Sequence, residues 1–115
     1  MFTHGQTLVS RDKKLRAKYL FVEDKDKSEK VKVGLSVSSN KGNSVWRNRI
    51  KRILRELIRK EKESLLSIVR QKNKKFLIIF SPLSINQDNF NKISLENLTA
   101  PMTDILNKLT KQNQF

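Results

Sequence analysis

The apolar residues of this chain are concentrated in four short runs, and this grouping limits the fold more than any other feature of the sequence. The runs are LRAKYLFV, VKVGLSV, ILRELI and FLIIF, and charged or polar stretches separate them. A chain of 115 residues has room for one hydrophobic core, because domains of roughly 100 to 150 residues are the commonest size. We therefore expect one folded domain, residues 1–115, rather than a disordered basic tail.

Two of these runs alternate in the manner of β-strands, and a charged stretch connects them. Residues 15–23 and residues 31–38 each place every second side chain on the same side of an extended chain. The stretch between them, residues 24–30, is DKDKSEK, and its polar composition predicts a turn that joins the two strands in a hairpin. The even-numbered side of the second strand carries a glycine and hydroxyl groups, which leave room for a ligand.

The stretch that follows has the periodicity of a long amphipathic helix. Asn43 and Ser44 are both suitable N-caps for it. The pattern runs to about Val69 but loosens after Arg59, because Glu61 drifts toward the apolar side. At about 100° per residue, the apolar face holds Trp46, Ile50, Ile53, Leu54 and Leu57.

The rest of the chain predicts one more strand and one more helix. FLIIF, residues 76–80, is flanked by polar residues and a proline, and it predicts a central buried strand. The C-terminal stretch has apolar residues at helical spacing, but Pro101 lacks an amide proton and is expected to break or kink the helix near Thr99 and Ala100. The expected order is strand, strand, helix, strand, helix, an α+β fold with helices packed on one face of a small sheet.

The face of the long helix opposite its apolar face is rich in cations. Between Lys41 and Lys62 the sequence has nine Lys or Arg residues and two acids, so pairing within the helix cannot neutralise the excess. A solvated helix face is the simpler interpretation, but guanidinium groups fit phosphates, and the chain's formal charge of +14 favours a polyanionic partner. The candidate RNA-binding residues are Lys41, Arg47, Asn48, Arg49, Lys51, Arg52, Arg55 and Arg59.

Residue types that support catalysis, metal binding or membrane insertion are missing or rare. The absence of cysteine excludes disulfides, zinc fingers and cysteine nucleophiles, and a lone His4 disfavours a His-based metal site or a Ser/His/Asp relay. Asp24, Asp26 and Glu29 lie among lysines, where two catalytic metal ions would be poorly held, so we expect no catalytic or metal-binding residues. No run approaches the roughly 20 apolar residues of a membrane span, so we expect a cytoplasmic protein without a membrane partner.

The segment GLSVSSNKGNSVWRNRIKR, residues 34–52, closely resembles the signature of the protein subunit of bacterial ribonuclease P. The likeness lies in the RNR helix and the glycine loop, and FTHG at residues 2–5 precedes them as in that family. The resemblance implies a sheet of about four strands with a left-handed β-α-β crossover through the RNR helix, although such connections are nearly always right-handed. It also implies a catalytic RNA, with bound magnesium, that removes the 5′ leader from precursor tRNA. The protein would bind the leader and stabilise the RNA, as a monomer in a 1:1 ribonucleoprotein.

Carried over by position, the residues of the RNR helix meet the catalytic RNA and border the leader. The leader would lie in a cleft on the sheet face that bears Ser36 and Ser38, where one aromatic of the first strand stacks a base. For Tyr19 or Phe21 core packing is an equally good interpretation, since one of the two must face inward, and we assign Trp46 to the core. The cleft residues implied in this way are Phe2, Tyr19, Phe21, Ser36, Ser38 and Asn40.

Three features depart from the family pattern. The basic helix that usually precedes the F-x-x-G turn and forms one wall of the leader cleft does not precede it in this sequence, so we expect either that the start is truncated or that the cleft is built differently. Ser39 and Asn40 stand where a lysine pair is typical, with Lys41 one place later, so one leader-phosphate contact is expected to be lost or moved. Pro101 is atypical in the last helix, where it threatens packing rather than chemistry.

A second function fits the same charge and architecture. A ribosomal or general structural RNA-binding protein would also be small, basic and α+β. Stimulated cleavage of precursor tRNA separates the two functions. A general binder would instead bind unrelated structured RNAs equally well and stimulate no cleavage.

Overall fold

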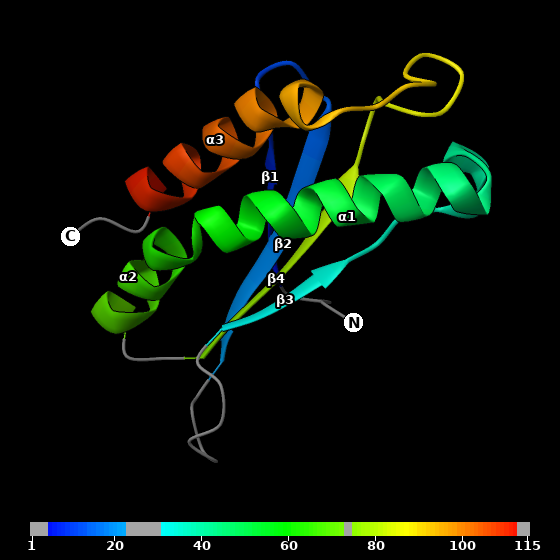
Figure 1. Ribbon diagram of the computed structural model, residues 1–115. Helices are drawn as coiled ribbons and strands as arrows, with labels where there is room; N and C mark the ends of the chain where they lie inside the picture. Colours follow the sequence, from blue (N-terminus) through cyan, green and yellow to red (C-terminus); the bar gives the residue numbers. More distant parts are fainter. Residues whose placement is uncertain (1–4, 23–30, 73–74, 113–115) are drawn as a thin grey trace.

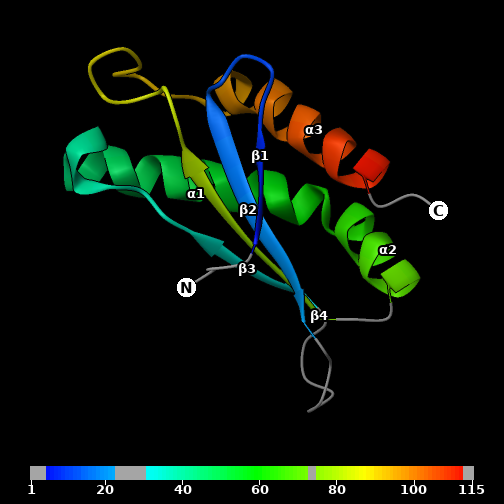
Figure 2. The same ribbon diagram turned by 180° about the vertical axis from the view of Figure 1, so that it is seen from behind.

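The computed structural model describes residues 5–22, 31–72 and 75–112, which form a four-stranded sheet with helices over one of its faces. The helices lie in front of the sheet in Figure 1, and the strands lie in front in the reverse view of Figure 2. The expected α+β architecture is therefore confirmed. The strands are β1 (Gln6–Val9), β2 (Leu15–Val22), β3 (Val31–Leu35) and β4 (Lys75–Pro82), and the helices are a 3₁₀ turn (Ser39–Lys41), α1 (Ser44–Lys60), α2 (Lys62–Lys72) and α3 (Leu95–Gln112).

The strand order is β1-β2-β4-β3, so the predicted hairpin between the strands at 15–23 and 31–38 is wrong. β4 pairs antiparallel with β2 and parallel with β3, and it separates them. Its central position is as predicted, and its side chains alternate between buried residues on the helix-covered face and half-buried residues on the other face. The predicted turn at 24–30 lies outside the described residues. Because β3 and β4 are parallel, α1 and α2 form the crossover between them, and its handedness stays a prediction.

The two faces of the sheet differ in what covers them. Odd-numbered residues of β2, such as Leu15 and Ala17, and even-numbered residues of β4, such as Phe76 and Phe80, are fully buried beneath the helices. The other face has no helix over it in the described chain, and its side chains are exposed or half-buried. We call it the open face. Strand β1, which the sequence analysis did not predict, extends the sheet beyond β2.

The predicted long helix is two helices, because the chain bends at Glu61. In one continuous helix Glu61 would fall at about 320°, within the apolar face, and its carboxylate would be buried without a partner. Instead α1 ends at Lys60, and the Glu61 amide donates to the carbonyls of Leu57 and Ile58. α2 then begins at a new angle and buries Leu65.

Helix α3 runs through Pro101, so the predicted break near Thr99 and Ala100 is wrong. The proline removes one hydrogen bond, to the carbonyl of Asn97, and its ring crowds that carbonyl, which together cost about 3 kcal/mol. Its ring is buried, and the apolar side chains around it hold the helix against the sheet. The predicted apolar stripe is confirmed, since Ile93, Leu98, Met102, Ile105, Leu106 and Leu109 are all buried.

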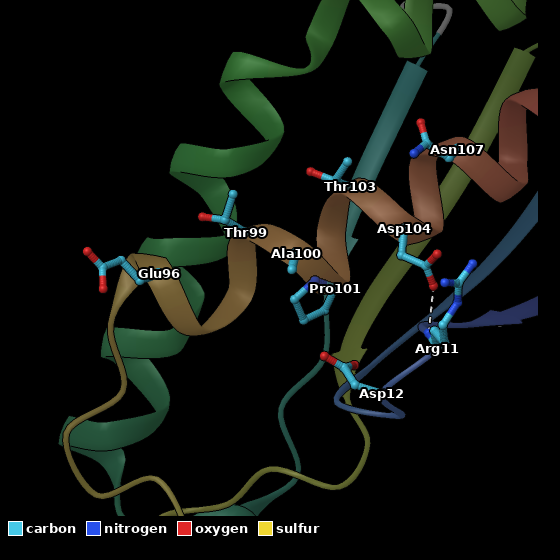
Figure 3. Close-up of a pocket in the computed structure, with 9 residues that line it drawn as sticks. All are labelled: Arg11, Asp12, Glu96, Thr99, Ala100, Pro101, Thr103, Asp104 and Asn107. Atoms are coloured by element: carbon cyan, nitrogen blue, oxygen red, sulfur yellow. Dashed lines mark hydrogen bonds between the residues drawn. The ribbon is translucent and has the colours of Figure 1, made fainter.

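The turn between β1 and β2 is fixed to α3 by Asp104. Its carboxylate accepts a hydrogen bond from the backbone N–H of Arg11 at 2.6 Å (Figure 3) and lies 3.4 Å from Lys108 Nζ. The hydrogen bond from Arg11 holds the pKa of Asp104 below its ordinary value. Lys108 also donates to the carbonyl of Val9 at 2.6 Å, which anchors β1. Arg11 and Asp104 line a groove of about 840 Å³ between this turn and α3.

Gly42, just before α1, tests how tightly the loop after β4 packs there. A Cβ atom at this position would lie 2.9 Å from both Gln87 Cβ and Trp46 Cε3. We expect Gly42→Ala to destabilise the fold by about 1–3 kcal/mol, the usual cost of overpacking, and to lower Tm by several degrees. Gly34→Ala is the comparison, because its Cβ would lie 3.3 Å from a side-chain atom of Ile79 that needs to shift by only a few tenths of an ångström, so we expect a smaller loss of Tm. Thermal unfolding measures both, and equal Tm values for Gly42→Ala and the parent would contradict this packing.

Candidate nucleic-acid interface

Helix α1 presents one buried face and one cationic face. Trp46, Ile50 and Leu54 are 2%, 0% and 0% exposed, and they join the core that contains Phe76 and Phe80 of the sheet. This burial confirms the predicted apolar face and the assignment of Trp46 to the core. On the other sides of the helix Asn48, Arg49, Arg52, Arg55 and Arg59 are exposed, and Arg47 and Lys51 are half-buried.

The cations of α1 have almost no acidic partners in the described part of the chain. Arg59 lies 4.0 Å from Glu56, and their side chains are 79% and 50% exposed, so this pair contributes little. No other ion pair among the described residues involves a cation of α1. The helix therefore presents unneutralised guanidinium groups on a rigid rod, and a polyanion would relieve their mutual repulsion.

The amino end of α1 is held in place by the loop between β4 and α3. The Asn43 side chain caps the helix by accepting the N–H of Trp46 at 2.9 Å. Gln87 in the loop accepts the N–H of Asn43 at 2.9 Å and donates its own backbone N–H to the Lys41 carbonyl at 2.7 Å. The Trp46 indole N–H donates to the Phe90 carbonyl at 2.8 Å. These bonds fix the first turn of the helix, and with it the direction in which the RNR residues point.

Two of the candidate RNA-binding residues, Lys41 and Arg47, donate hydrogen bonds to backbone carbonyls. Lys41 Nζ donates to the Leu83 carbonyl at 2.6 Å, so its charge lies at the loop junction rather than on the exposed helix face. Arg47 Nε donates to the Gly42 carbonyl at 3.1 Å. The other N–H groups of that guanidinium are free to bind a phosphate, because arginine carries five donors.

The residues implied for the leader cleft do not share one face. Ser36 is exposed. It comes directly after the last residue of β3 and continues the even-numbered side of that strand, which belongs to the open face. Tyr19 and Phe21 lie on the helix-covered face, where Tyr19 is 4% exposed and both rings pack near Phe76. The expectation that one of these aromatics joins Ser36 in a cleft is therefore wrong, because residues two apart in a strand point the same way. Ser38 and Asn40 are exposed at the 3₁₀ turn, and Phe2 lies outside the described residues.

The open face carries cations and aliphatic side chains instead of aromatic rings. Arg16 and Lys18 of β2 point to it, and the register places them opposite Ser81 and Ile79 of β4. Lys32 of β3 shares this face and is exposed. The sequence places these three cations together, because each has an even number in one of the alternating runs 15–23 and 31–38. This face offers positive charge, hydroxyl groups and aliphatic side chains, which together suit a single-stranded nucleic acid.

Two further residues near the interface were not predicted. Gln87 positions the start of α1, but it stands in a loop without any pattern that would single it out. Val45 is 68% exposed on α1 beside the cationic face, where it offers an apolar contact to a sugar or base.

Neither a metal-binding cluster nor a membrane-spanning helix is found among the described residues. No three His, Cys, Asp or Glu side chains among them are placed to hold a metal ion. None of the described helices combines the length and the apolar character that crossing a bilayer requires.

Comparison with known proteins assigns the family. A model described as Ribonuclease P matches residues 4–110. The chain belongs to the ribonuclease P family. It is 47% identical over 79 residues to the ribonuclease P protein component of Bacillus velezensis, a match that covers 69% of this chain and 59% of that protein. The chain thus matches less than two thirds of the length of this curated relative.

Solved structures agree with the fold. The RNase P protein from Thermotoga maritima superposes with a TM-score of 0.69 at 19% identity, covering 93% of this chain and 86% of that one. The RNase P protein of Staphylococcus aureus gives a TM-score of 0.64 at 20% identity, covering 91% and 81% of the two chains. The architecture around α1 is therefore that of ribonuclease P proteins.

Replacing Arg52 tests whether the exposed cations of α1 bind phosphate. If Arg52 contacts one phosphate, Arg52→Ala should reduce the slope of log affinity against log salt by about 0.7–0.9 in binding to the family's catalytic RNA. Filter binding across a salt series measures the slope. Lys111→Ala, an exposed cation near the end of α3, is the matched control and should leave it unchanged. An Arg52→Ala slope equal to that of the parent would remove this residue from the interface.

Proposed function

We propose that this chain is the protein subunit of a bacterial ribonuclease P. In this assembly a catalytic RNA hydrolyses one phosphodiester bond and so removes the 5′ leader from precursor tRNA. The observation that carries the proposal is the cationic face of α1, whose one ion pair among the described residues is the long, exposed contact of Arg59 with Glu56, in a chain of this family. The curated relative named as a ribonuclease P protein component supports it. The protein supplies binding and charge, and the RNA supplies the reacting groups.

Helix α1 binds the catalytic RNA through its exposed cations. Arg49, Arg52 and Arg55 project from a helix whose other side is buried, so the backbone that carries them is already ordered, and binding a phosphate orders only the side chains themselves. Each contact releases condensed counterions from the RNA, and this gain in entropy drives association. Asn48 lies among them and both donates and accepts hydrogen bonds, which suits a base edge or a ribose hydroxyl.

The leader lies across the open face of the sheet. Lys18 and Lys32 attract its phosphates, and Ser36 bonds a sugar or phosphate oxygen. Leu77 and Ile79 of β4 give the bases an aliphatic surface. The bases bind there by burying apolar surface and not through hydrogen bonds to their edges. We expect this surface to accept leaders of many sequences, since aliphatic contact and phosphate attraction select no base. Ser38 and Asn40 lie at the 3₁₀ turn, where the leader can reach them on its way to α1.

Magnesium belongs to the RNA in this proposal. The protein's charge of +14 replaces part of the cation atmosphere that folded RNA otherwise draws from magnesium. Protein and RNA assemble in a 1:1 complex, and this complex acts in the cytoplasm. The chain's own contribution is greatest when magnesium is scarce.

Reconstitution with the catalytic RNA of a bacterial ribonuclease P tests this function. At limiting magnesium the protein should raise the rate of precursor-tRNA cleavage by about tenfold or more, which corresponds to at least about 1.4 kcal/mol. The double variant Arg52→Ala/Arg55→Ala should lose most of the stimulation while keeping its Tm, since both side chains are exposed. Lys111→Ala should keep full stimulation.

The same experiment separates this function from that of a general RNA-binding protein. Folded parent protein that fails to stimulate cleavage would contradict the proposal. Equal affinity for unrelated structured RNAs would then favour the general binder.

A further inference from the structure

The cationic face of α1 continues into a groove beside the sheet, between strand β3, α1 and the start of α2. The groove has a volume of about 520 Å³. Its floor is aliphatic, formed by Val31, Val33 and Leu35 of β3. We call it the β3 groove.

The groove exists because β3 is an edge strand that the helices do not fully cover. The odd-numbered residues of β3 face the same side as the buried Phe76, Ile78 and Phe80 of β4, with which they pair in register. Even so, Val33 is 37% exposed on that side. The aliphatic floor is therefore open to solvent, and a ligand that covered it would gain from its burial.

The wall of the groove is cationic. Lys51, Arg55 and Arg59 line it from α1, four residues apart, at a rise of about 6 Å from each to the next. Lys62, the first residue of α2, adds a fourth cation. No acid lines the groove among the described residues, and the one ion pair of its wall is the long, exposed contact of Arg59 with Glu56. A ligand of this groove is thus an anion with regularly spaced charges and an apolar part.

We propose that the β3 groove binds an unpaired segment of the catalytic RNA, with phosphates against the four cations and sugars and bases against the aliphatic floor. The inference rests on the proposed function, and it adds a site that includes Lys62 and the β3 edge, outside the RNR signature at 34–52. An unpaired strand fits better than a duplex, because paired bases stack inside the helix and cannot reach Val33.

An acidic peptide added to the edge of β3 is the competing occupant, and the strand itself disfavours it. β3 has five residues, and Lys32 and Gly34 interrupt its apolar sequence. Short edge strands with lysine resist the addition of another strand. The cations also lie on the helix rather than along the strand edge, so they favour a backbone of phosphates that follows α1.

Lys62 and Lys60 make a matched pair for testing the groove. Both are exposed lysines two residues apart, but Lys62 lines the groove and Lys60 does not. In binding to the catalytic RNA of a bacterial ribonuclease P, Lys62→Ala should make the negative slope of log affinity against log salt shallower by about 0.7–0.9, with Tm unchanged. Lys60→Ala should change the slope by much less. Equal slopes for Lys62→Ala and the parent would overturn the proposal.

A cross-link identifies what lies on the groove floor. The chain has no cysteine, so Val33→Cys introduces a single attachment point for a photoreactive group. Cross-links to unpaired nucleotides of the catalytic RNA support the proposal, and cross-links confined to paired nucleotides overturn it. Thr103→Cys on α3, away from the groove, is the control. If the complex forms but Val33→Cys cross-links to the RNA no more than Thr103→Cys does, the proposal is also overturned. Binding of an acidic peptide that displaces no RNA would assign the groove to the competing occupant and overturn it as well.

The cross-link needs no cleavage, so the two proposals fail separately. Cross-linking at unpaired nucleotides without stimulated cleavage would contradict the proposed function and keep the groove as an RNA site. Stimulated cleavage without cross-linking would keep the function and remove the groove.

Discussion

The burial of the apolar face of α1 is the interaction on which the rest of the structure depends. Trp46, Ile50 and Leu54 are almost completely removed from water, and each buried side chain of this kind contributes about 1.5–3 kcal/mol. That gain offsets the repulsion among the cations on the other side of the same helix. It also fixes the rotation of the helix, so that Arg52 and Arg55 must face solvent. A chain with a charge of +14 can thus fold before its polyanionic partner arrives.

Features set by local periodicity could be predicted from the sequence, and features set by competition between elements could not. The two faces of α1, the alternation of β2 and the apolar stripe of α3 follow from spacing alone. The strand order does not follow from spacing, because the alternation within β2 and β3 does not show that β4 pairs between them. Helix α3 survives Pro101 because packing outweighs one lost hydrogen bond. Alternation alone places Tyr19 and Phe21 on the same face, and the structure shows that this is the helix-covered face, where both rings pack near Phe76.

The edge position of β3 brings the functional surfaces close together. Its even-numbered residues belong to the open face, and its odd-numbered residues form the floor of the β3 groove beneath α1. One short strand therefore separates the surface proposed for the leader from the surface proposed for the catalytic RNA. The loop around Gln87 fixes the start of α1 relative to the sheet, through its hydrogen bonds to Asn43 and Lys41.

The protection of lysine amines on RNA binding tests the central claim, that the cationic side of α1 is the RNA-binding surface. Brief acylation followed by mass spectrometry compares each lysine in the free protein and in the complex with the catalytic RNA. The account predicts that Lys51 on α1 becomes strongly protected, whereas the exposed Lys111 on α3 reacts as before. Unchanged reactivity of Lys51 in a complex that has demonstrably formed would contradict it.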